Sequence, residues 1–202
     1  APWMETMSSL AVVTVITRNY VPYARALALS VKEHEPQMPF WVCLADDPDP
    51  EFQPPAEWDH WFLARDLKIP GWRRFAFQYT PFELSCARKS FAIQYLVDQG
   101  YERVVYLDAD MQLYAPLTEL HRWLDESSIV LTPHRRQASA ACPDIYERVL
   151  LTAGAFNAGF LAVRQGEVAS DFLGWWQARM AKDCVHDLPG GMFVDQKWLD
   201  LV

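Results

Sequence analysis

The sequence lacks the long apolar run that a membrane helix needs. No stretch of its 202 residues approaches the ~18 consecutive apolar residues of such a helix. The first residues show no basic segment followed by an apolar one, so they do not resemble a secretory signal peptide. We therefore expect no transmembrane segment and a cytoplasmic protein.

Cysteine pairs and clustered basic residues are also scarce. The chain has four cysteines, Cys43, Cys86, Cys142 and Cys184. They form no C-x-x-C pair and have mostly apolar neighbours, which favours buried free thiols in a reducing compartment. Arg73-Arg74 and Arg135-Arg136 are isolated pairs in a chain of formal net charge -8, so nucleic acid is not the expected main partner. An acidic protein that binds an anionic nucleotide needs local positive charge, and a bound metal ion supplies it.

Hydrophobic residues, in contrast, are abundant. They make up 51% of the chain and charged residues 22%, which suits a sizeable buried core and excludes a disordered chain. Nine Trp and eight Tyr are many for this length. Aromatic side chains at this density either line grooves that bind sugars or flat rings, or pack in the core, and the sequence leaves both interpretations open.

Strand and helix patterns alternate along the chain. The predicted strands cover residues 12–16, 40–45, 60–64, 103–107, 129–131 and 159–163. The predicted helices cover residues 24–31, 80–98, 143–153, 167–182 and 193–201. Thr80, Pro81 and Glu83 form a capping box at the start of the second helix. This order predicts an α/β domain with a mostly parallel central sheet flanked by helices, and ligands at the carboxyl ends of its strands.

Two carboxylates follow the predicted strand at 103–107, in the sequence Asp108-Ala109-Asp110. If the backbone stays extended there, residues i and i+2 point the same way and both carboxylates converge on one point. A cation between them relieves their repulsion, and hard oxygen ligands suit Mn²⁺ or Mg²⁺. Such an ion keeps open positions for phosphate oxygens and acts on them as a Lewis acid. The alternative is that both carboxylates are solvated turn residues.

Three segments together resemble a nucleotide-sugar transferase of the Rossmann-like GT-A fold. They are VVYLDAD at 104–110, FNAGF at 156–160 and FVDQ at 193–196, in the order found in that family. The sequence resembles the retaining glycosyltransferase family 8 and its bacterial relatives. The resemblance implies one GT-A domain over residues 1–202. It would transfer a hexose from a nucleotide-diphosphate sugar, with UDP-sugar expected, to an acceptor that is a glycan, a lipid or a protein.

The resemblance also implies roles for single residues. The implied donor-binding and cofactor-binding set is Thr17, Asn19, Tyr20, Lys89, Asp108, Ala109 and Asp110. Asp108 and Asp110 would be the ligands of Mn²⁺ or Mg²⁺. The implied catalytic set near the anomeric carbon is Asn157, Asp195 and Gln196.

Structural explanations stay open for four of these residues. Lys89 also suits a solvated helix face, and Tyr20 also suits core packing. Asn157 also suits a turn before Gly159, and Asp195 also suits the first turn of a helix, where the dipole favours a carboxylate. The sequence does not choose between a carboxylate nucleophile and attack from the face of the leaving group.

The third metal ligand of the family is not found at its usual place. The family supplies a His near the end of the catalytic domain, whereas His186 precedes Asp195. We expect the ligand to lie beyond Val202, in which case the domain is truncated at its C-terminus. The alternative is a module that binds nucleotide sugars without catalysis.

Two other enzyme classes fit less well. Asp108 and Asp110 also resemble the first motif of haloacid-dehalogenase-like phosphatases, with a nucleophile and a general acid, but that motif normally follows the first strand of its domain. A sugar nucleotidyltransferase normally carries a Gly-rich basic loop after its first strand. The segment at 17–22 contains no glycine.

Overall fold

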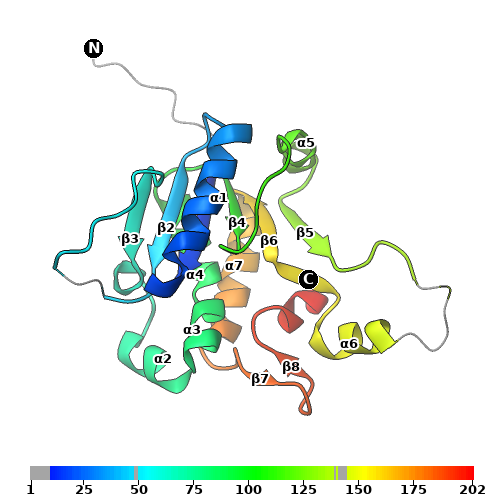
Figure 1. Cartoon of the computed structure of the whole chain (residues 1–202). Coiled ribbons are helices and arrows are strands. Elements are labelled where there is room, and N and C mark those ends of the chain that lie inside the picture. Colours follow the sequence, from blue (N-terminus) through cyan, green and yellow to red (C-terminus); the bar gives the residue numbers. More distant parts are fainter. Residues whose placement is uncertain (1–9, 48–49, 139, 141–144) are drawn as a thin grey trace.

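A six-stranded sheet forms the centre of the molecule (Figure 1). The computed structural model describes residues 10–47, 50–138, 140 and 145–202. The strands are β1 (Leu10–Ile16), β2 (Phe40–Leu44), β3 (His60–Leu63), β4 (Arg103–Leu107), β5 (Ile129–Pro133) and β6 (Phe156–Arg164). Their order is β3-β2-β1-β4-β6-β5. The pairs among β1 to β4 are parallel, and β6 is antiparallel to both of its neighbours. The predicted α/β fold with a mostly parallel sheet is confirmed.

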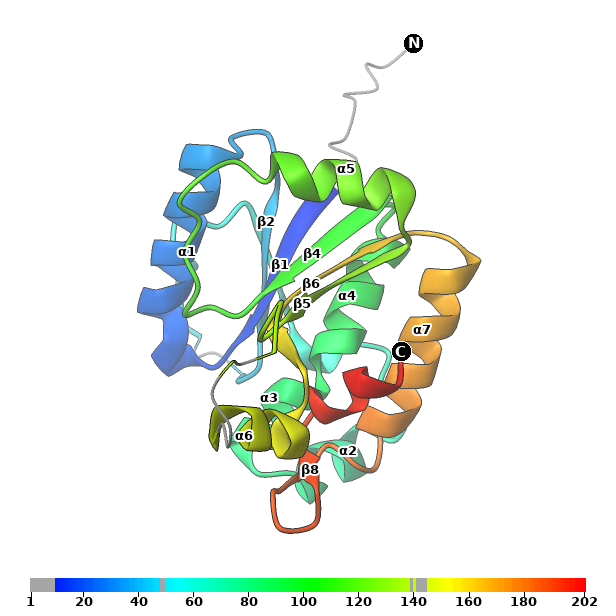
Figure 2. The same ribbon diagram turned by 90° about the vertical axis from the view of Figure 1, so that its right-hand side faces the viewer.

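Helices cover both faces of this sheet (Figures 1 and 2). One face carries α1 (Val21–His34) and α5 (Thr118–Glu126). The other carries α2 (Trp72–Gln78), α3 (Pro81–Ala87), α4 (Lys89–Asp98) and α7 (Glu167–Met180). Strand β1 is buried throughout, and its residues alternate between the two cores, Val12 on the α1 side and Val13 on the α4 side. This double coverage explains why its sequence is a continuous apolar run.

The remaining elements lie at the end of the sheet where β1 and β4 finish. They are α6 (Ile145–Ala153), the hairpin of β7 (His186–Asp187) and β8 (Met192–Phe193), and three 3₁₀ helices, η1 (Arg18–Tyr20), η2 (Ala64–Asp66) and η3 (Lys197–Leu201). In Figures 1 and 2, α3, α6 and β8 lie near this edge. The chain therefore returns to the ends of β1 and β4 after residue 180.

Two predicted helices are corrected by the structure. The helix at 80–98 is divided at Arg88 into α3 and α4, because the Arg88 N–H bonds to the Cys86 carbonyl and not to a carbonyl four residues earlier. The helix predicted at 193–201 is reduced to the 3₁₀ helix η3 over Lys197–Leu201, and its first four residues lie outside that helix. Phe193 pairs with His186 in a hairpin, and Val194 has a φ of 41°, which a helix does not allow. The helix predicted at 143–153 begins, within the described residues, at Ile145.

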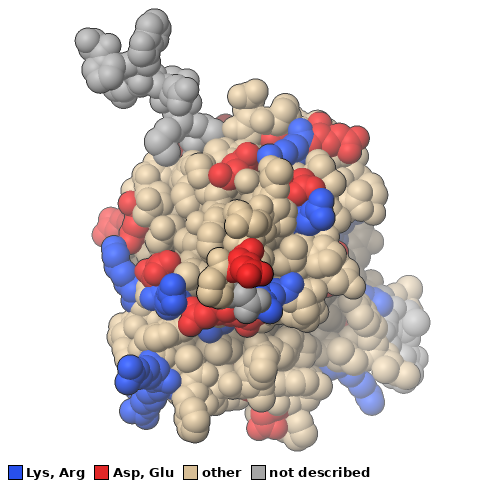
Figure 3. All heavy atoms as spheres, turned by 60° about the vertical axis from the view of Figure 1, so that its left-hand side comes forward, with Lys and Arg blue, Asp and Glu red and all other residues tan. Residues whose placement is uncertain are grey.

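Three of the four cysteines lie within the described residues. Cys43, Cys86 and Cys184 are buried and free, and burial raises the pKa of the Cys43 thiol to about 12; Cys142 lies outside the described residues. In the described part of the chain, no helix is both long and apolar enough to cross a membrane. Acidic and basic side chains are interspersed over the face that carries the β3 edge (Figure 3).

Candidate active site

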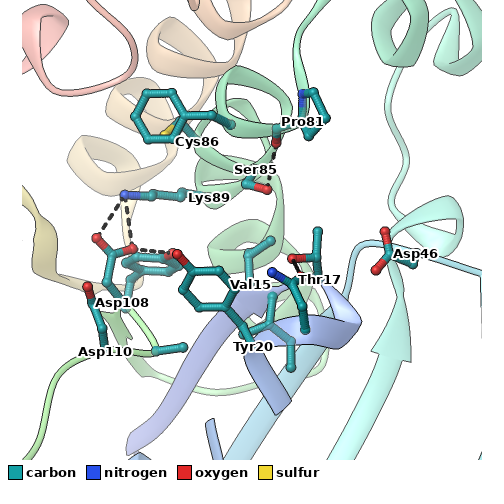
Figure 4. A pocket seen from close by; sticks show the side chains of 15 residues that line it. Val15, Thr17, Tyr20, Asp46, Pro81, Ser85, Cys86, Lys89, Asp108 and Asp110 are labelled. Carbon is teal, nitrogen blue, oxygen red and sulfur yellow. Dashed lines mark hydrogen bonds and ion pairs between the residues drawn. The ribbon is translucent and has the colours of Figure 1, made fainter. Parts of the chain in front are cut away.

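A cavity of about 490 Å³ lies where β1, β2 and β4 end. It is lined by Val15, Ile16, Thr17, Asn19, Tyr20, Asp46, Pro81, Phe82, Ser85, Cys86, Lys89, Tyr106, Asp108, Ala109 and Asp110. In Figure 4, Pro81, Ser85 and Cys86 lie on one side of the cavity and Thr17 and Tyr20 on the opposite side. The seven residues that the sequence assigned to donor and cofactor binding are therefore brought to one cavity from three separate segments.

Asp108 and Asp110 lie in a tight turn that follows β4. The strand ends at Leu107, and the Met111 N–H bonds to the Asp108 carbonyl at 3.0 Å. The expectation of extended backbone was therefore wrong, because the chain must turn as soon as it leaves the sheet. Both side chains still line the cavity (Figure 4), with Asp110 exposed and Asp108 partly buried. The turn, rather than the alternation of a strand, brings the two carboxylates to the same site.

Lys89 is buried at the floor of this cavity, at the start of α4. Its Nζ lies 3.1 Å from Asp108 Oδ1 and 3.3 Å from Asp195 Oδ2. The same Nζ lies 5.1 Å from the centre of the Tyr106 ring and donates to the Ala158 carbonyl. Burial alone would lower the pKa of the Lys89 ammonium group. Electrostatic interactions with Asp195, Tyr106 and Asp108 outweigh this effect and hold the pKa well above its ordinary value. The solvated helix face considered for Lys89 is therefore wrong.

Asp195 is 1% exposed and faces Lys89 from the C-terminal segment. Burial raises the pKa of its carboxyl group, the Asp108 charge adds to this effect, and Lys89 opposes it. Asp195 comes after Val194, a buried β-branched residue in the left-handed region, and the Asp195 carbonyl accepts from the Trp176 indole at 3.3 Å. A β-branched residue with positive φ is strained, and such strain is found where the surrounding structure fixes a functional group.

Asn157 and Gly159 lie in β6, next to the Asp108 turn. The Asn157 side-chain oxygen accepts from the Gly159 N–H at 2.7 Å. A Cβ added at Gly159 would lie 2.8 Å from Asp108 Oδ2 and 2.9 Å from Asn157 Oδ1. Position 159 therefore accepts only glycine without moving these side chains, and Asn157 belongs to the strand rather than to a turn.

The Gln196 side chain is turned toward the backbone. Its amide nitrogen donates to the Ala153 carbonyl at 3.0 Å, and its oxygen accepts from the Ala158 N–H at 3.4 Å. Both ends of the amide thus tie the C-terminal segment to α6 and β6. Gln196, Asn157 and Asp195 are not among the residues that line the cavity. Asp195 is linked to the cavity through Lys89.

Tyr106 is a residue of the site that the sequence analysis assigned only to a strand. Its hydroxyl donates to Asp108 Oδ1 at 2.8 Å, and burial raises its pKa well above the ordinary value. Tyr106 lies two residues before Asp108 in an apolar strand, where a tyrosine that packs and a tyrosine that donates to a carboxylate show the same sequence pattern. Asp46 at the end of β2 and Phe82 in α3 also line the cavity. Phe82 lies next to a capping residue, and nothing in its local pattern indicates a ligand site.

Two oxygen ligands at the cavity suit a divalent cation. Carboxylate oxygens are the ligands that Mn²⁺ and Mg²⁺ prefer, and the Tyr106 and Lys89 contacts orient the Asp108 carboxylate. Within the described residues, no three His, Cys, Asp or Glu side chains come together to hold a metal ion. His186 is exposed in β7, where it packs against Phe82 and Phe193. The protein side of the site thus fits an ion that also takes ligands from a substrate.

Comparison of sequences gives one curated relative. No protein-family profile matches the chain. The uncharacterized protein YfnF of Bacillus subtilis (strain 168) is 23% identical over 205 residues, covering 93% of this chain and 63% of YfnF. The chain therefore spans less than two thirds of that relative.

Comparison of structures identifies the fold. The glycosyltransferase GlyE of Streptococcus pneumoniae TIGR4 matches 95% of this chain and 42% of its own, with 18% identity and a TM-score of 0.53. Mouse xyloside xylosyltransferase 1 matches 95% of this chain and 80% of its own, with 13% identity and a TM-score of 0.54. Core-mannan synthase A (CmsA/Ktr4) of Aspergillus fumigatus, in its Mn/GDP form, matches 100% of this chain and 71% of its own, with 8% identity and a TM-score of 0.56. Over most of its length, the chain is structurally similar to glycosyltransferases of the GT-A fold.

Proposed function

We propose that this chain is the catalytic domain of a glycosyltransferase that takes a hexose from a nucleotide-diphosphate donor, with UDP-sugar the first candidate. The acceptor would be a glycan, a lipid or a protein. One observation carries the proposal: residues 17–20, Lys89 and residues 108–110 meet at a single cavity of a GT-A-like fold. This cavity lies at the carboxyl ends of parallel strands, where open α/β sheets bind their ligands.

The donor nucleotide would lie along the turn that follows β1. The Tyr20 ring centre lies 5.3 Å from that of Tyr23, and Tyr20 is 43% exposed. Because much of the ring is open to solvent, it is available to stack on a base. Thr17 and Asn19, joined by a side-chain hydrogen bond, would bind the ribose. Asp46 lines the same region and is fixed by the Arg18 N–H at 2.7 Å.

The diphosphate would lie at the turn that follows β4. Asp108 and Asp110 would hold Mn²⁺ or Mg²⁺, and the ion would neutralise charge on the departing diphosphate. Lys89 would add a positive charge from the floor of the cavity, held in place by Asp108 and Asp195. Tyr106 would keep the Asp108 carboxylate in one orientation through its hydrogen bond.

The transferred sugar would lie between this turn and the C-terminal segment. Asn157 and Asp195 are the groups that we propose near the anomeric carbon, and we propose transfer with retention. Gln196, whose amide is bonded to Ala153 and Ala158, would hold the C-terminal segment beside them. The bond from that carbon to the diphosphate oxygen breaks, a bond to an acceptor hydroxyl oxygen forms, and the hydroxyl proton would pass to the departing diphosphate. Asp195, buried beside Lys89, is the carboxylate that would stabilise positive charge on the sugar.

Thermal unfolding with nucleotides tests the proposal. The protein is heated with UDP, GDP, ADP or CMP, each with and without Mn²⁺. A ligand at ~100 times its Kd adds ~2.7 kcal/mol, which raises Tm by roughly 5–10 °C for a domain of this size. We expect one nucleotide to raise Tm in a Mn²⁺-dependent way, which would also identify the base of the donor. Absence of a shift with every nucleotide would contradict the proposal.

The Asp110→Asn variant tests the metal assignment. Asp110 is exposed, so the fold should survive while the Mn²⁺-dependent shift is lost, because an amide oxygen carries no negative charge for the cation. Asp171→Asn, at an exposed position of α7 away from the cavity, is the matched control and should keep the shift. A normal shift in Asp110→Asn, or its loss in both variants, would refute the assignment.

A binding module without catalysis is the second candidate. The described residues hold no cluster of three metal-binding side chains, and this observation favours it. Such a module would bind the nucleotide with Mn²⁺ but would neither hydrolyse nor transfer the sugar. The GT-A-like fold argues against the phosphatase alternative, since Asp108 follows the fourth strand of the chain rather than the first.

A further inference from the structure

Three aromatic side chains meet beside the cavity, and one of them, Phe82, lines it. Phe82 of α3 lines the cavity and is 50% exposed. Its ring centre lies 5.9 Å from that of His186 and 6.5 Å from that of Phe193, which belong to the β7–β8 hairpin. His186 and Phe193 contact each other edge-to-face at 5.2 Å. We call Phe82, His186 and Phe193 the aromatic cluster.

The cluster is held rigidly by the start of α3. Glu83 Oε1 accepts from the backbone N–H of His186 at 2.8 Å, and Glu83 Oε2 accepts from the backbone N–H of Thr80 at 2.9 Å. One carboxylate thus fixes the hairpin to the helix that carries Phe82. The backbone segments that carry Phe82 and His186 are therefore joined before any ligand arrives, which reduces the conformational entropy lost on binding.

The chain also links the cluster to the proposed reaction centre. Phe193 lies two residues before Asp195, which contacts Lys89, and Lys89 contacts Asp108. The proposed nucleotide residues Thr17 and Tyr20 lie across the cavity from Pro81 and Ser85 of α3, the helix that also carries Phe82 (Figure 4). A ligand on the aromatic cluster would therefore lie beside the proposed sugar position without displacing the base.

We propose that the aromatic cluster is the acceptor subsite and that it binds a pyranose ring, with one face of the sugar stacked on Phe82. This proposal rests on the proposed function. Axial C–H groups on one face of a pyranose carry partial positive charge, which the negative face of an aromatic ring attracts. The contacts with His186 and Phe193 leave Phe82 half exposed at the cavity, and a sugar face would cover the exposed part of the ring.

The acceptor, rather than the transferred sugar, is the occupant that the geometry favours. Phe82 and His186 both remain accessible from solvent, and so does Leu188 at the hairpin tip, 41% exposed. A transferred sugar enters with its nucleotide and must lie at the diphosphate, by Asp108. The acceptor arrives separately from solvent, so an open aromatic surface at the cavity wall suits it.

Saturation-transfer NMR tests the subsite. The probes are methyl β-D-galactopyranoside and methyl α-D-glucopyranoside, with glycerol as a polyol that has no ring face, each measured with UDP and Mn²⁺ present. We expect saturation of one face of at least one glycoside and none of glycerol. In Phe82→Ala the signal should fall about fivefold, since truncation removes the stacked ring. Phe77→Ala is the matched control: Phe77 is 93% exposed in α2, away from the cavity, and should keep the signal.

The outcomes separate this proposal from the proposed function. If wild type and Phe82→Ala show the same Mn²⁺-dependent Tm shift with UDP but also the same glycoside signal, the subsite is refuted and the donor site stands. Absence of glycoside saturation in wild type also refutes the subsite. A Phe82-dependent glycoside signal without any nucleotide shift would keep the sugar subsite and refute the transferase.

Discussion

The Asp108 carboxylate is positioned by two side chains from different elements. Tyr106 reaches it along β4, with its hydroxyl 2.8 Å from Oδ1, and Lys89 reaches it from α4 at 3.1 Å. A carboxylate that accepts from a neutral donor and a cation has little rotational freedom. We infer that Tyr106 is a positioning residue for the proposed metal ligand.

Tyr106→Phe tests this role. The substitution keeps the buried ring beneath Lys89 but removes one hydrogen bond to a charged group, which contributes about 1.5–3 kcal/mol. We expect the Mn²⁺ concentration for the half-maximal UDP-induced Tm shift to rise about tenfold. Tyr101→Phe is the control, because Tyr101 is also buried but bonds to the Trp41 indole. Equal Mn²⁺ requirements in the two variants would contradict the role of Tyr106.

Single residues were predictable where a motif named them. Asp108 and Asp110 were singled out by their spacing after an apolar strand, and Lys89 by the resemblance to the family. Tyr106 was not singled out, since a tyrosine in an apolar strand has the same pattern whether it packs or donates. The contact between Lys89 and Asp195 could not be predicted either, because the two residues lie 106 positions apart and no local sequence pattern connects them.

At the scale of elements, the capping box at the start of α3 also holds a distant segment of the chain. The Thr80 hydroxyl accepts from the Glu83 N–H, as the capping box predicted. The same Glu83 carboxylate also accepts from the His186 N–H, which lies in β7. Partial burial works to raise the pKa of Glu83, but the hydrogen bonds from His186 and Thr80 outweigh it and hold the pKa below its ordinary value.

Glu83→Gln should therefore have a pH-dependent effect. The folded-state pKa is lowered, so the stabilisation from Glu83 is present above its unfolded pKa and is lost as pH falls through the folded pKa. At pH 7 we expect the variant to unfold roughly 3 °C below wild type, as for a lost cap of ~1 kcal/mol. The difference should close as pH drops below about 4. A difference that stays constant down to pH 3 would show that Glu83 acts through packing instead of its charge.

Elements that depend on local pattern were predicted, and those that depend on tertiary contact were not. The strand at 103–107 was predicted with its observed bounds, because it is an apolar run that ends at two carboxylates. The segment at 193–201 has helix-like spacing, but its first residue pairs with His186 and Val194 takes a left-handed conformation. Helix propensity is a weak preference, and these non-local contacts overrode it.

At the scale of the molecule, the sheet order explains why the site draws on distant segments. The order β2-β1-β4-β6 places the ends of β1 and β4 side by side, with the Asn157–Gly159 part of β6 next to Asp108. Segment 184–202 then lies at the start of α4, where Asp195 contacts Lys89. The three charged groups thus join α4, the end of β4 and the C-terminal segment. Their pairing should stabilise the whole fold as well as the site.

A double-mutant cycle at Lys89 and Asp195 tests that coupling. Lys89→Met leaves the buried Asp195 carboxylate without its cation, whereas Asp108 keeps the hydrogen bond from Tyr106. Loss of one partner of a buried pair costs about 3–5 kcal/mol, or roughly 10 °C in Tm. Adding Asp195→Asn removes the unpaired charge and should recover part of that loss. The exposed pair of Lys68 and Asp98 is the control, since Lys68 is 85% exposed and such pairs contribute about 0–1 kcal/mol. If the Tm losses of Lys89→Met and Asp195→Asn simply add in the double variant, the two residues are not coupled in the fold. The C-terminal segment is then held by packing alone, and the buried pair serves the site.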